Sequence, residues 1–278
     1  MQASFLELIE AQWTRGKHVC VGLDVDVARL PAHLDGSPAE RCVAFARDIV
    51  DATAEVAAAY KPNAAFFEAL GADGPAALRD VIRHIHRATE DAPVIVDAKR
   101  ADIANSNNGS VHYVFDYLAA DAVTLHPYLG HEAVRPFLER ADKGIFVLCR
   151  TSNPGAGELQ DLNVAGSPLF LHVATLVKSD WNYNLNCGLV VGATYPAELA
   201  TIRTRIPDLP LLIPGVGAQG GDLEATVRAA FAAGELRALV NASRAVLYAS
   251  GGRDFASAAR AAADDLHTSI TRVVANLG

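Results

Sequence analysis

The apolar residues of this chain fall into short continuous runs, which are separated by longer stretches of mixed apolar and polar residues. Eight of the runs have the length and the apolar content that are typical of strands buried on both faces of a parallel sheet. The eight predicted strands are His18–Val25, Ala58–Asn63, Pro93–Lys99, Ala122–Pro127, Gly144–Thr151, Cys187–Thr194, Leu211–Val216 and Ala238–Ser243.

Ala-rich stretches of helical character lie between most of these strands. They are Ala39–Ala57, Pro75–Glu90, Asn107–Ala119, Glu132–Arg140, Ser167–Ser179, Pro196–Arg205 and Leu223–Ala233. A short amphipathic helix is predicted over Phe5–Trp13, before the first strand, and a last helix over Phe255–Asn276. Repeated βα units predict a parallel sheet.

Eight βα units in about 250 residues predict a closed (β/α)8 TIM barrel, an α/β fold, here with a short N-terminal helix. An open doubly wound sheet is the alternative. No Gly/Ser- or Pro-rich linker divides the chain, so we expect residues 1–278 to form one domain. The longest irregular stretch is Asn153–Ala165, which has the length of a lid loop; a floppy surface insertion is the alternative interpretation.

The composition and charge of the chain exclude several classes of binding partner and cellular location. The net charge is −8 and no basic block is present, so we expect no nucleic-acid surface, although a local cationic pocket for a small anion fits an acidic protein. No apolar run reaches the roughly 18 residues of a membrane span, and the N-terminus lacks a signal-peptide pattern. The cysteines form no C-x-x-C pair, which favours free thiols and a reduced, cytoplasmic protein.

The stretch Val94–Ser106, V-I-V-D-A-K-R-A-D-I-A-N-S, carries the strongest chemical signal. Asp97, Lys99, Arg100 and Asp102 place four charges in six positions at the end of a buried strand, which is costly unless the charges pair. Asp97 and Lys99 are two residues apart, so on a strand they share one face. For an isolated D-x-K pair, the simpler interpretation is a salt-bridged strand end.

Most of the other predicted strands also end in polar or Gly-rich residues. These strand ends are Gly22-Leu23-Asp24, Lys61-Pro62-Asn63, His126-Pro127-Tyr128, Arg150-Thr151-Ser152-Asn153 and Asn241-Ala242-Ser243-Arg244. Each has an ordinary explanation as a cap, a solvated strand end or a packed side chain. In a barrel, however, the carboxyl ends of all the strands meet at the face where catalysis takes place, so the ring of polar ends predicts a site there.

The segment Pro214–Gly221, P-G-V-G-A-Q-G-G, points to a phosphate group. Its glycines let the backbone approach a ligand, and the helix that follows offers free amides and a positive dipole end. Barrels often bind phosphate after strands seven and eight, and Arg244 would add a bidentate cation. A Gly-rich turn with a surface arginine is the alternative.

No metal or organic cofactor is expected. His84 and His86 diverge on a helix, and His126 and His131 only flank a turn. The chain also lacks a Ser-His-Asp arrangement, a Rossmann glycine fingerprint and a P-loop.

These residues together resemble the orotidine 5′-phosphate decarboxylase family. D-A-K-R-A-D-I matches its D-x-K-x-x-D signature. The motifs that resemble the family's longer bacterial branch are K-P-N-A-A-F-F-E, T-L-H-P-Y-L-G, C-R-T-S-N-P-G, V-G-A-T-Y-P and P-G-V-G-A-Q-G-G. Two positions depart from the family pattern: His126 stands where Asn is common, and Ser106 where Thr is usual. Both retain hydrogen-bonding ability.

The resemblance implies metal-free decarboxylation of orotidine 5′-monophosphate (OMP) to uridine 5′-monophosphate (UMP) in de novo pyrimidine biosynthesis. The implied catalytic tetrad is Lys61, Asp97, Lys99 and Asp102, with Lys99 stabilising and protonating a carbanion at C6. The family's second aspartate reaches into the partner's site, so Asp102 implies a homodimer with shared active sites, to which Ser106 also contributes. The implied substrate contacts are Asp24 on the ribose, Ser152 on the pyrimidine, and Gly217, Ala218, Gln219 and Arg244 on the phosphate.

Two other functions remain open from the sequence. A metal-dependent decarboxylase or aldolase that acts on a sugar phosphate would share D-x-K-x-x-D, but it would carry a metal-binding carboxylate near the end of the second strand, where this chain has Lys61. A barrel that binds a nucleotide without turnover would be expected to lack a catalytic residue, and none is missing.

Overall fold

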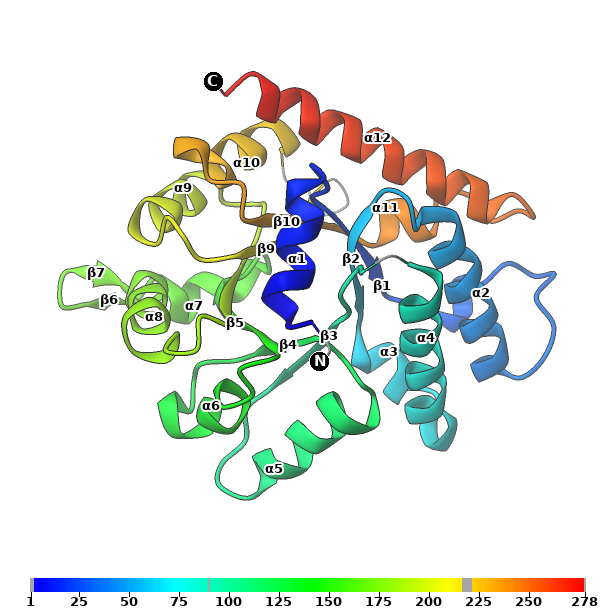
Figure 1. Ribbon diagram of the computed structural model, residues 1–278, viewed down its shortest axis with the longest axis horizontal. Helices are drawn as coiled ribbons and strands as arrows, with labels where there is room; N and C mark the ends of the chain where they lie inside the picture. Colours follow the sequence, from blue (N-terminus) through cyan, green and yellow to red (C-terminus); the bar gives the residue numbers. More distant parts are fainter. Residues whose placement is uncertain (1–2, 90, 217–221, 278) are drawn as a thin grey trace.

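The computed structural model describes residues 3–89, 91–216 and 222–277, and its central feature is a barrel of eight parallel strands (Figure 1). The strands are β1 Val19–Leu23, β2 Ala57–Pro62, β3 Ile95–Arg100, β4 Ala122–Leu125, β5 Gly144–Arg150, β8 Cys187–Val191, β9 Leu211–Pro214 and β10 Ala238–Ala242. Their order is β2-β1-β10-β9-β8-β5-β4-β3. Parallel bridges from Tyr60 to Val94 and from Asn63 to Asp97 join β2 to β3. The bridges close the barrel, which confirms the predicted fold and excludes the open sheet.

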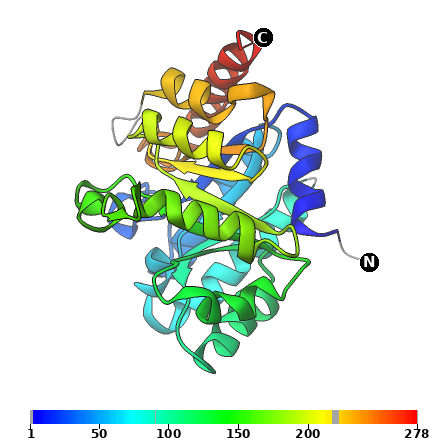
Figure 2. The ribbon, with the colours of Figure 1, turned by 90° about the vertical axis from the view of Figure 1, so that its left-hand side faces the viewer.

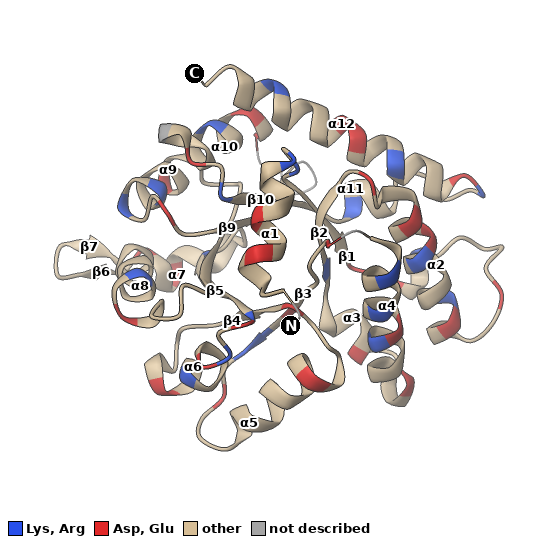
Figure 3. Ribbon diagram, viewed as in Figure 1, with Lys and Arg blue, Asp and Glu red and all other residues tan. Residues whose placement is uncertain are grey.

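Helices surround the strands, as Figure 1 shows. They are α2 Pro38–Thr53, α4 Gly74–Ala88, α5 Ser106–Val111, α6 Gly130–Leu138, α8 Leu169–Leu176, α9 Pro196–Arg205, α10 Leu223–Ala230 and α12 Phe255–Ala275. Two of them, α5 and α8, continue as single π-helical segments, η3 His112–Tyr117 and η5 Val177–Trp181. Figure 3 shows both basic and acidic residues on α2, α4 and α12.

The sequence did not predict several short elements. These are η1 Val27–Arg29, α3 Ala64–Glu68, η2 Gly71–Asp73, η6 Ala232–Gly234 and α11 Arg244–Leu247. Four of them, all except η6, lie in the connections that follow β1, β2 and β10. One-turn helices of this kind are too short to show an apolar period, so the pattern of the sequence carries no signal for them.

The prediction that Asn153–Ala165 is irregular was wrong. The segment contains η4 Pro154–Ala156 and α7 Gly157–Gln160, and it ends in a hairpin of β6 Asn163–Val164 with β7 Ser167–Pro168. The two residues between these strands, Ala165 and Gly166, have φ angles of 51° and 87°. Tight hairpin turns require such positive angles and usually place Asn, Asp or Gly at both positions. Because Ala165 is none of these residues, the sequence did not indicate a turn.

Helix α1, Phe5–Thr14, covers the amino-terminal end of the barrel. Phe5, Ile9 and Trp13 are buried against inward-facing strand residues, and the Phe5 ring meets Phe146 edge-on at 5.6 Å between centroids. The Trp13 indole donates to the Ala238 carbonyl at 3.1 Å. Figure 2 shows α1 at one end of the barrel and the β6–β7 hairpin projecting at the other, so the carboxyl ends of the strands remain accessible.

The inward-facing positions change from apolar to polar along the barrel axis. Near α1 the interior is filled by Cys20, Ile95, Ala122, Phe146, Leu212 and Leu239. Two residues further along their strands, the same face carries Asp97 on β3, Thr124 on β4 and Asn241 on β10, all of which border a cavity. Because side chains alternate along a strand, this shift places polar groups on a closed apolar floor. Among the described residues, no helix is long and apolar enough to cross a membrane.

Candidate active site

A cavity of about 480 Å³ opens at the carboxyl ends of the strands. All eight strands, or the loops that directly follow them, contribute to its wall. The polar lining comes mainly from β1, β2, β3 and β10, whereas Leu148, Val190, Leu212 and Pro214 form an apolar wall opposite them. A cavity with one polar and one apolar side is suited to a small molecule that is itself part charged and part planar.

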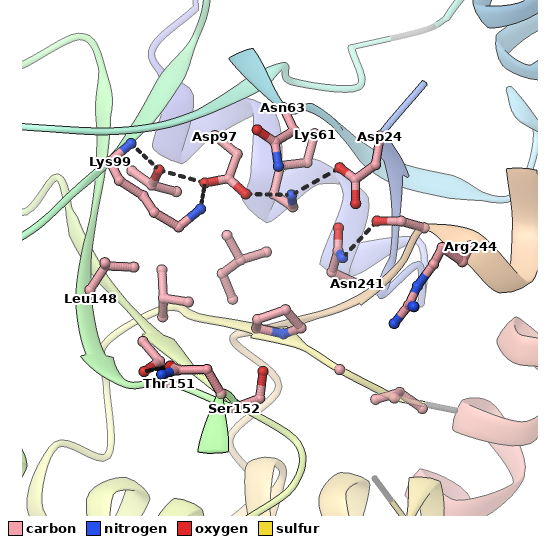
Figure 4. A pocket seen from close by; sticks show the side chains of 18 of the residues that line it. Asp24, Lys61, Asn63, Asp97, Lys99, Leu148, Thr151, Ser152, Asn241 and Arg244 are labelled. Carbon is pink, nitrogen blue, oxygen red and sulfur yellow. Dashed lines mark hydrogen bonds and ion pairs between the residues drawn. The ribbon is translucent and has the colours of Figure 1, made fainter. Parts of the chain in front are cut away.

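Asp97 lies at the centre of the polar wall and contacts two lysines (Figure 4). The Lys61 ammonium donates to Asp97 Oδ2 at 2.8 Å, and the Lys99 ammonium donates to Oδ1 at 2.6 Å. The Thr124 hydroxyl also donates to Oδ1, at 2.9 Å. Lys61 Nζ is further 4.0 Å from Asp24 Oδ1. The four charges therefore form one continuous alternating array, Asp24–Lys61–Asp97–Lys99.

The array keeps its charges because each buried ion faces a partner of opposite sign. Burial alone would raise the pKa of Asp97, but Lys61 and Lys99 together hold it well below its usual range. Burial alone would lower the pKa of Lys61, but Asp97 and Asp24 raise it above its usual value. The Lys61 side chain is 5% exposed and the Lys99 side chain 50% exposed. Lys99 is therefore the ammonium of the array that reaches the open part of the cavity.

The backbone of Lys99 is strained into this position. Its φ angle is 47°, in a region that residues with a side chain rarely adopt, and the register of β3 against β4 shifts between Val96 and Arg100. The Thr124 hydroxyl accepts the N–H groups of both Ala98 and Lys99, at 3.1 and 3.0 Å. Such strain costs of order 1–3 kcal/mol and is concentrated at functional sites.

Two glycines allow the strand ends to pack closely around the cavity. A Cβ atom on Gly22 would lie 2.0 Å from Ser243 Oγ, and one on Gly192 would lie 2.8 Å from Ser152 Cβ. A side chain at either position would displace a residue that lines the cavity. Gly22 thus brings β1 close to the end of β10, and Gly192 brings the end of β8 close to Ser152.

The structure brings six of the sequence-predicted site residues together. Those that line the cavity are Asp24, Lys61, Asp97, Lys99, Ser152 and Arg244. Asp102 and Ser106 are exposed and lie outside its wall. Gly217, Ala218 and Gln219 lie outside the described residues. His126, the departure from the family pattern, does not line the cavity.

Sequence reasoning missed several residues of the cavity wall, chiefly Thr124, Leu148 and Gln160. Thr124 and Leu148 follow Ala122 and Phe146 by two positions, so strand alternation could have identified both as facing inward. Gln160 comes from α7 in the segment that was predicted to be irregular, and nothing in its local sequence indicates that it turns back to Thr151. Among the described residues, no three His, Cys, Asp or Glu side chains cluster as metal ligands would.

Comparison with known proteins identifies the family of this chain. The family model for the orotidine 5′-phosphate decarboxylase / HUMPS family matches residues 17–261. The chain belongs to this family. A relative named orotidine 5′-phosphate decarboxylase from Herpetosiphon aurantiacus is 52% identical over 258 residues, which is 92% of this chain and 94% of the relative. One of the same name from Roseiflexus castenholzii is 52% identical over 267 residues, 96% of each chain. The solved structure of Leishmania donovani OMP decarboxylase is 39% identical, with a TM-score of 0.85 and 98% of both chains covered.

We expect Asp97→Asn to destabilise the folded protein by about 3–5 kcal/mol, because the buried Lys61 ammonium loses its nearest carboxylate. The stabilisation by ionised Asp97 is complete above the ordinary aspartate pKa of 3.8, and it is lost as the pH falls from there towards the lower pKa of the folded state. Urea unfolding at a series of pH values measures both effects. The wild type should lose its advantage over the variant only below about pH 4.

The matched control is Glu68→Gln, which removes the partly exposed ion pair between Glu68 and Arg100 at the outside of β3. This carboxylate-to-amide change should cost about 1 kcal/mol or less. A cost for Asp97→Asn as small as that of the control would contradict the account of the charged array.

Proposed function

We propose that this protein decarboxylates OMP to UMP, a step of de novo pyrimidine biosynthesis, without a metal or an organic cofactor. The observation that carries the proposal is the array Lys61–Asp97–Lys99, in which a lysine occupies the end of β2 and a second lysine faces the open cavity. The relatives named above, which match nearly the full length of the chain, support the same reaction.

We assign separate regions of the cavity to the parts of a nucleotide. Arg244 stands at the end of the cavity opposite Lys99, where its guanidinium would bind the phosphate together with Gly217, Ala218 and Gln219. Asp24 borders the same end of the cavity as Arg244 and would accept hydrogen bonds from ribose hydroxyls. Ser152 lies across the cavity from Asp97 and would meet the pyrimidine. This arrangement directs C6 of the pyrimidine towards Lys99.

Lys99 then performs the chemistry. The bond between C6 and the carboxylate carbon breaks, CO₂ leaves, and the electron pair stays on C6. The Lys99 ammonium stabilises the developing negative charge and donates a proton to C6, which yields UMP and a neutral amine. Because Lys99 is half exposed, water can restore its proton. Asp97 remains ionised throughout and holds Lys99 in place.

The rival reaction on a sugar phosphate requires a metal-binding carboxylate at the end of β2. That position holds Lys61, whose ammonium is buried and bonded to Asp97. A cation beside this ammonium would be repelled, so the array disfavours the metal-dependent reaction.

The segment after β5 borders the cavity through Ser152, Asn153 and Gln160, and Arg150 anchors it. The buried Arg150 guanidinium donates to Gln160 at 3.2 Å and to Asp161 at 3.3 Å, and it lies 3.9 Å from the centroid of the Tyr195 ring. Gln160 in turn accepts from the Thr151 N–H and donates to the Thr151 hydroxyl. We infer that this segment acts as the lid, and that binding of the remote phosphate supplies free energy for its closure.

Asp102 and Ser106 complete the site only if a second copy of the chain supplies them. Both are exposed and outside the cavity of their own chain. Three large apolar side chains are also exposed: Ile103, which follows Asp102, and Tyr128 and Leu129, which follow the neighbouring strand β4. Apolar residues gathered on a surface favour association. We therefore propose a homodimer in which Asp102 contacts the partner's Lys99. The free, buried state of Cys20, Cys42, Cys149 and Cys187 supports our placement of the protein in the reducing cytoplasm.

The direct test is the ultraviolet absorbance of OMP mixed with the purified protein and excess chelator. The absorbance of OMP should fall with the wild type, and Lys99→Ala should lower kcat by about 10³-fold or more, because it removes both the charge and the proton donor. A folded wild type that leaves OMP unchanged, or one that needs an added metal ion, would remove the assignment.

Mixing two inactive variants tests the shared site. Lys99→Ala and Asp102→Ala dimers should each be nearly inactive, but a mixed dimer contains one site with both native residues. After random exchange of subunits, about a quarter of wild-type activity should return. If activity stays at the level of the separate variants although mixed dimers are detected by mass spectrometry, Asp102 does not act across the interface.

A further inference from the structure

The Asp24 carboxylate is held in place mainly through its backbone. Asp24 follows β1, and its Oδ1 atom is buried without a hydrogen-bond partner among the described residues. Lys61 Nζ is 4.0 Å from that oxygen, too far for a hydrogen bond. A carboxylate that is to meet ribose hydroxyls needs a fixed position, because small misplacements of binding groups weaken recognition. The position of Asp24 therefore depends on what fixes the chain around it.

The Tyr248 hydroxyl fixes this part of the chain from both sides. It donates to the Asp24 carbonyl at 3.0 Å and accepts the Asp26 N–H at 2.7 Å. One hydroxyl thus bridges two backbone groups that flank Val25. Burial raises the pKa of Tyr248, so the hydroxyl keeps the proton that it donates at neutral pH.

The Tyr248 ring is itself held between two side chains. The Phe45 ring stacks on it, at 6.0 Å between centroids and an interplanar angle of 15°, and the Arg29 guanidinium lies 3.7 Å from its centroid. Phe45 is fully buried in the core. The bridging hydroxyl is therefore attached to a ring with little freedom to move.

Tyr248 also connects Asp24 with the proposed phosphate contact. It directly follows α11, whose first residue is Arg244, and its N–H donates to the Arg244 carbonyl at 3.2 Å. Figure 4 shows Asp24 and Arg244 at the same end of the cavity. One short helix thus carries both the phosphate cation and the residue that holds the ribose carboxylate.

We propose that Tyr248 is a positioning residue for nucleotide recognition, which sets the Asp24 carboxylate against the ribose hydroxyls and fixes its distance from Arg244. This inference rests on the proposed function. It assigns to the residue after α11 a role in ribose selection, although Tyr248 does not line the cavity.

The test is the affinity of Tyr248→Phe for UMP and for 2′,3′-dideoxyuridine 5′-monophosphate, measured by calorimetry. The change removes the hydroxyl and keeps the ring. We expect UMP affinity to fall about 3–10-fold, as for the loss of one or two hydrogen bonds that fix a binding group, and dideoxy nucleotide affinity to change by less than about 2-fold. In an Asp24→Ala background, the same Tyr248→Phe change should have no further effect on UMP affinity.

The matched control is Tyr60→Phe. The Tyr60 hydroxyl also makes two buried hydrogen bonds, to the Val50 carbonyl and to Thr53, but it lies on the outer side of β2 and does not border the cavity. This variant should be less stable than the wild type and should bind both nucleotides as the wild type does.

Any of three outcomes would overturn the inference: an unchanged UMP affinity of folded Tyr248→Phe, an equal loss of affinity for both nucleotides, or an effect on UMP affinity that persists without the Asp24 carboxylate. A wild type that binds no UMP and does not decarboxylate OMP would instead remove the proposed function. The nucleotide titrations together with the OMP assay therefore distinguish a failure of this inference from a failure of the proposed function.

Discussion

The structure depends on one buried carboxylate, Asp97, held between two lysine ammonium groups. An isolated ion in this position would neutralise or draw in water, because the transfer of a charge out of water is very costly. Lys61, Lys99 and Thr124 satisfy both carboxylate oxygens, so the negative charge persists on the cavity wall at the end of β3. The positive charge of Lys99 then has a fixed position from which it can meet a substrate.

The barrel provides the apolar surroundings and the backbone geometry on which the ion pairs of Asp97 depend. Its interior is apolar near α1 and carries polar side chains two residues further along β3, β4 and β10, so an apolar layer lies beneath the charges and excludes water from that side. The bulge in β3 brings Lys99 back towards Asp97 at the cost of a left-handed φ angle. The Thr124 hydroxyl stabilises this strained backbone because it accepts the N–H groups of Ala98 and Lys99. The strained backbone at Lys99 and the barrel fold thus both position the residues of this ion array.

Much of this could be predicted from the sequence, for identifiable reasons. The eight apolar runs predicted the barrel because parallel strands that are buried on both faces consist almost entirely of apolar residues. The D-A-K spacing predicted that the Asp97 and Lys99 side chains lie on the same face of β3. The hairpin around Ala165 escaped prediction because its turn uses an unusual residue. The roles of Gln160 and Tyr248 depend on contacts between segments distant in sequence, which no local pattern encodes. The role that we propose for Asp102 depends on a second chain.

The ionisation of Asp97 is the most direct test of the account. With the aspartate carboxyl carbons labelled with ¹³C, the Asp97 signal can be assigned by its absence from the spectrum of Asp97→Asn and followed as the pH is lowered. The account predicts that this carboxyl stays ionised through the ordinary aspartate pKa of 3.8, because both lysines hold its pKa below that value. A carboxyl that titrates at or above 3.8 while the protein remains folded would contradict the central claim.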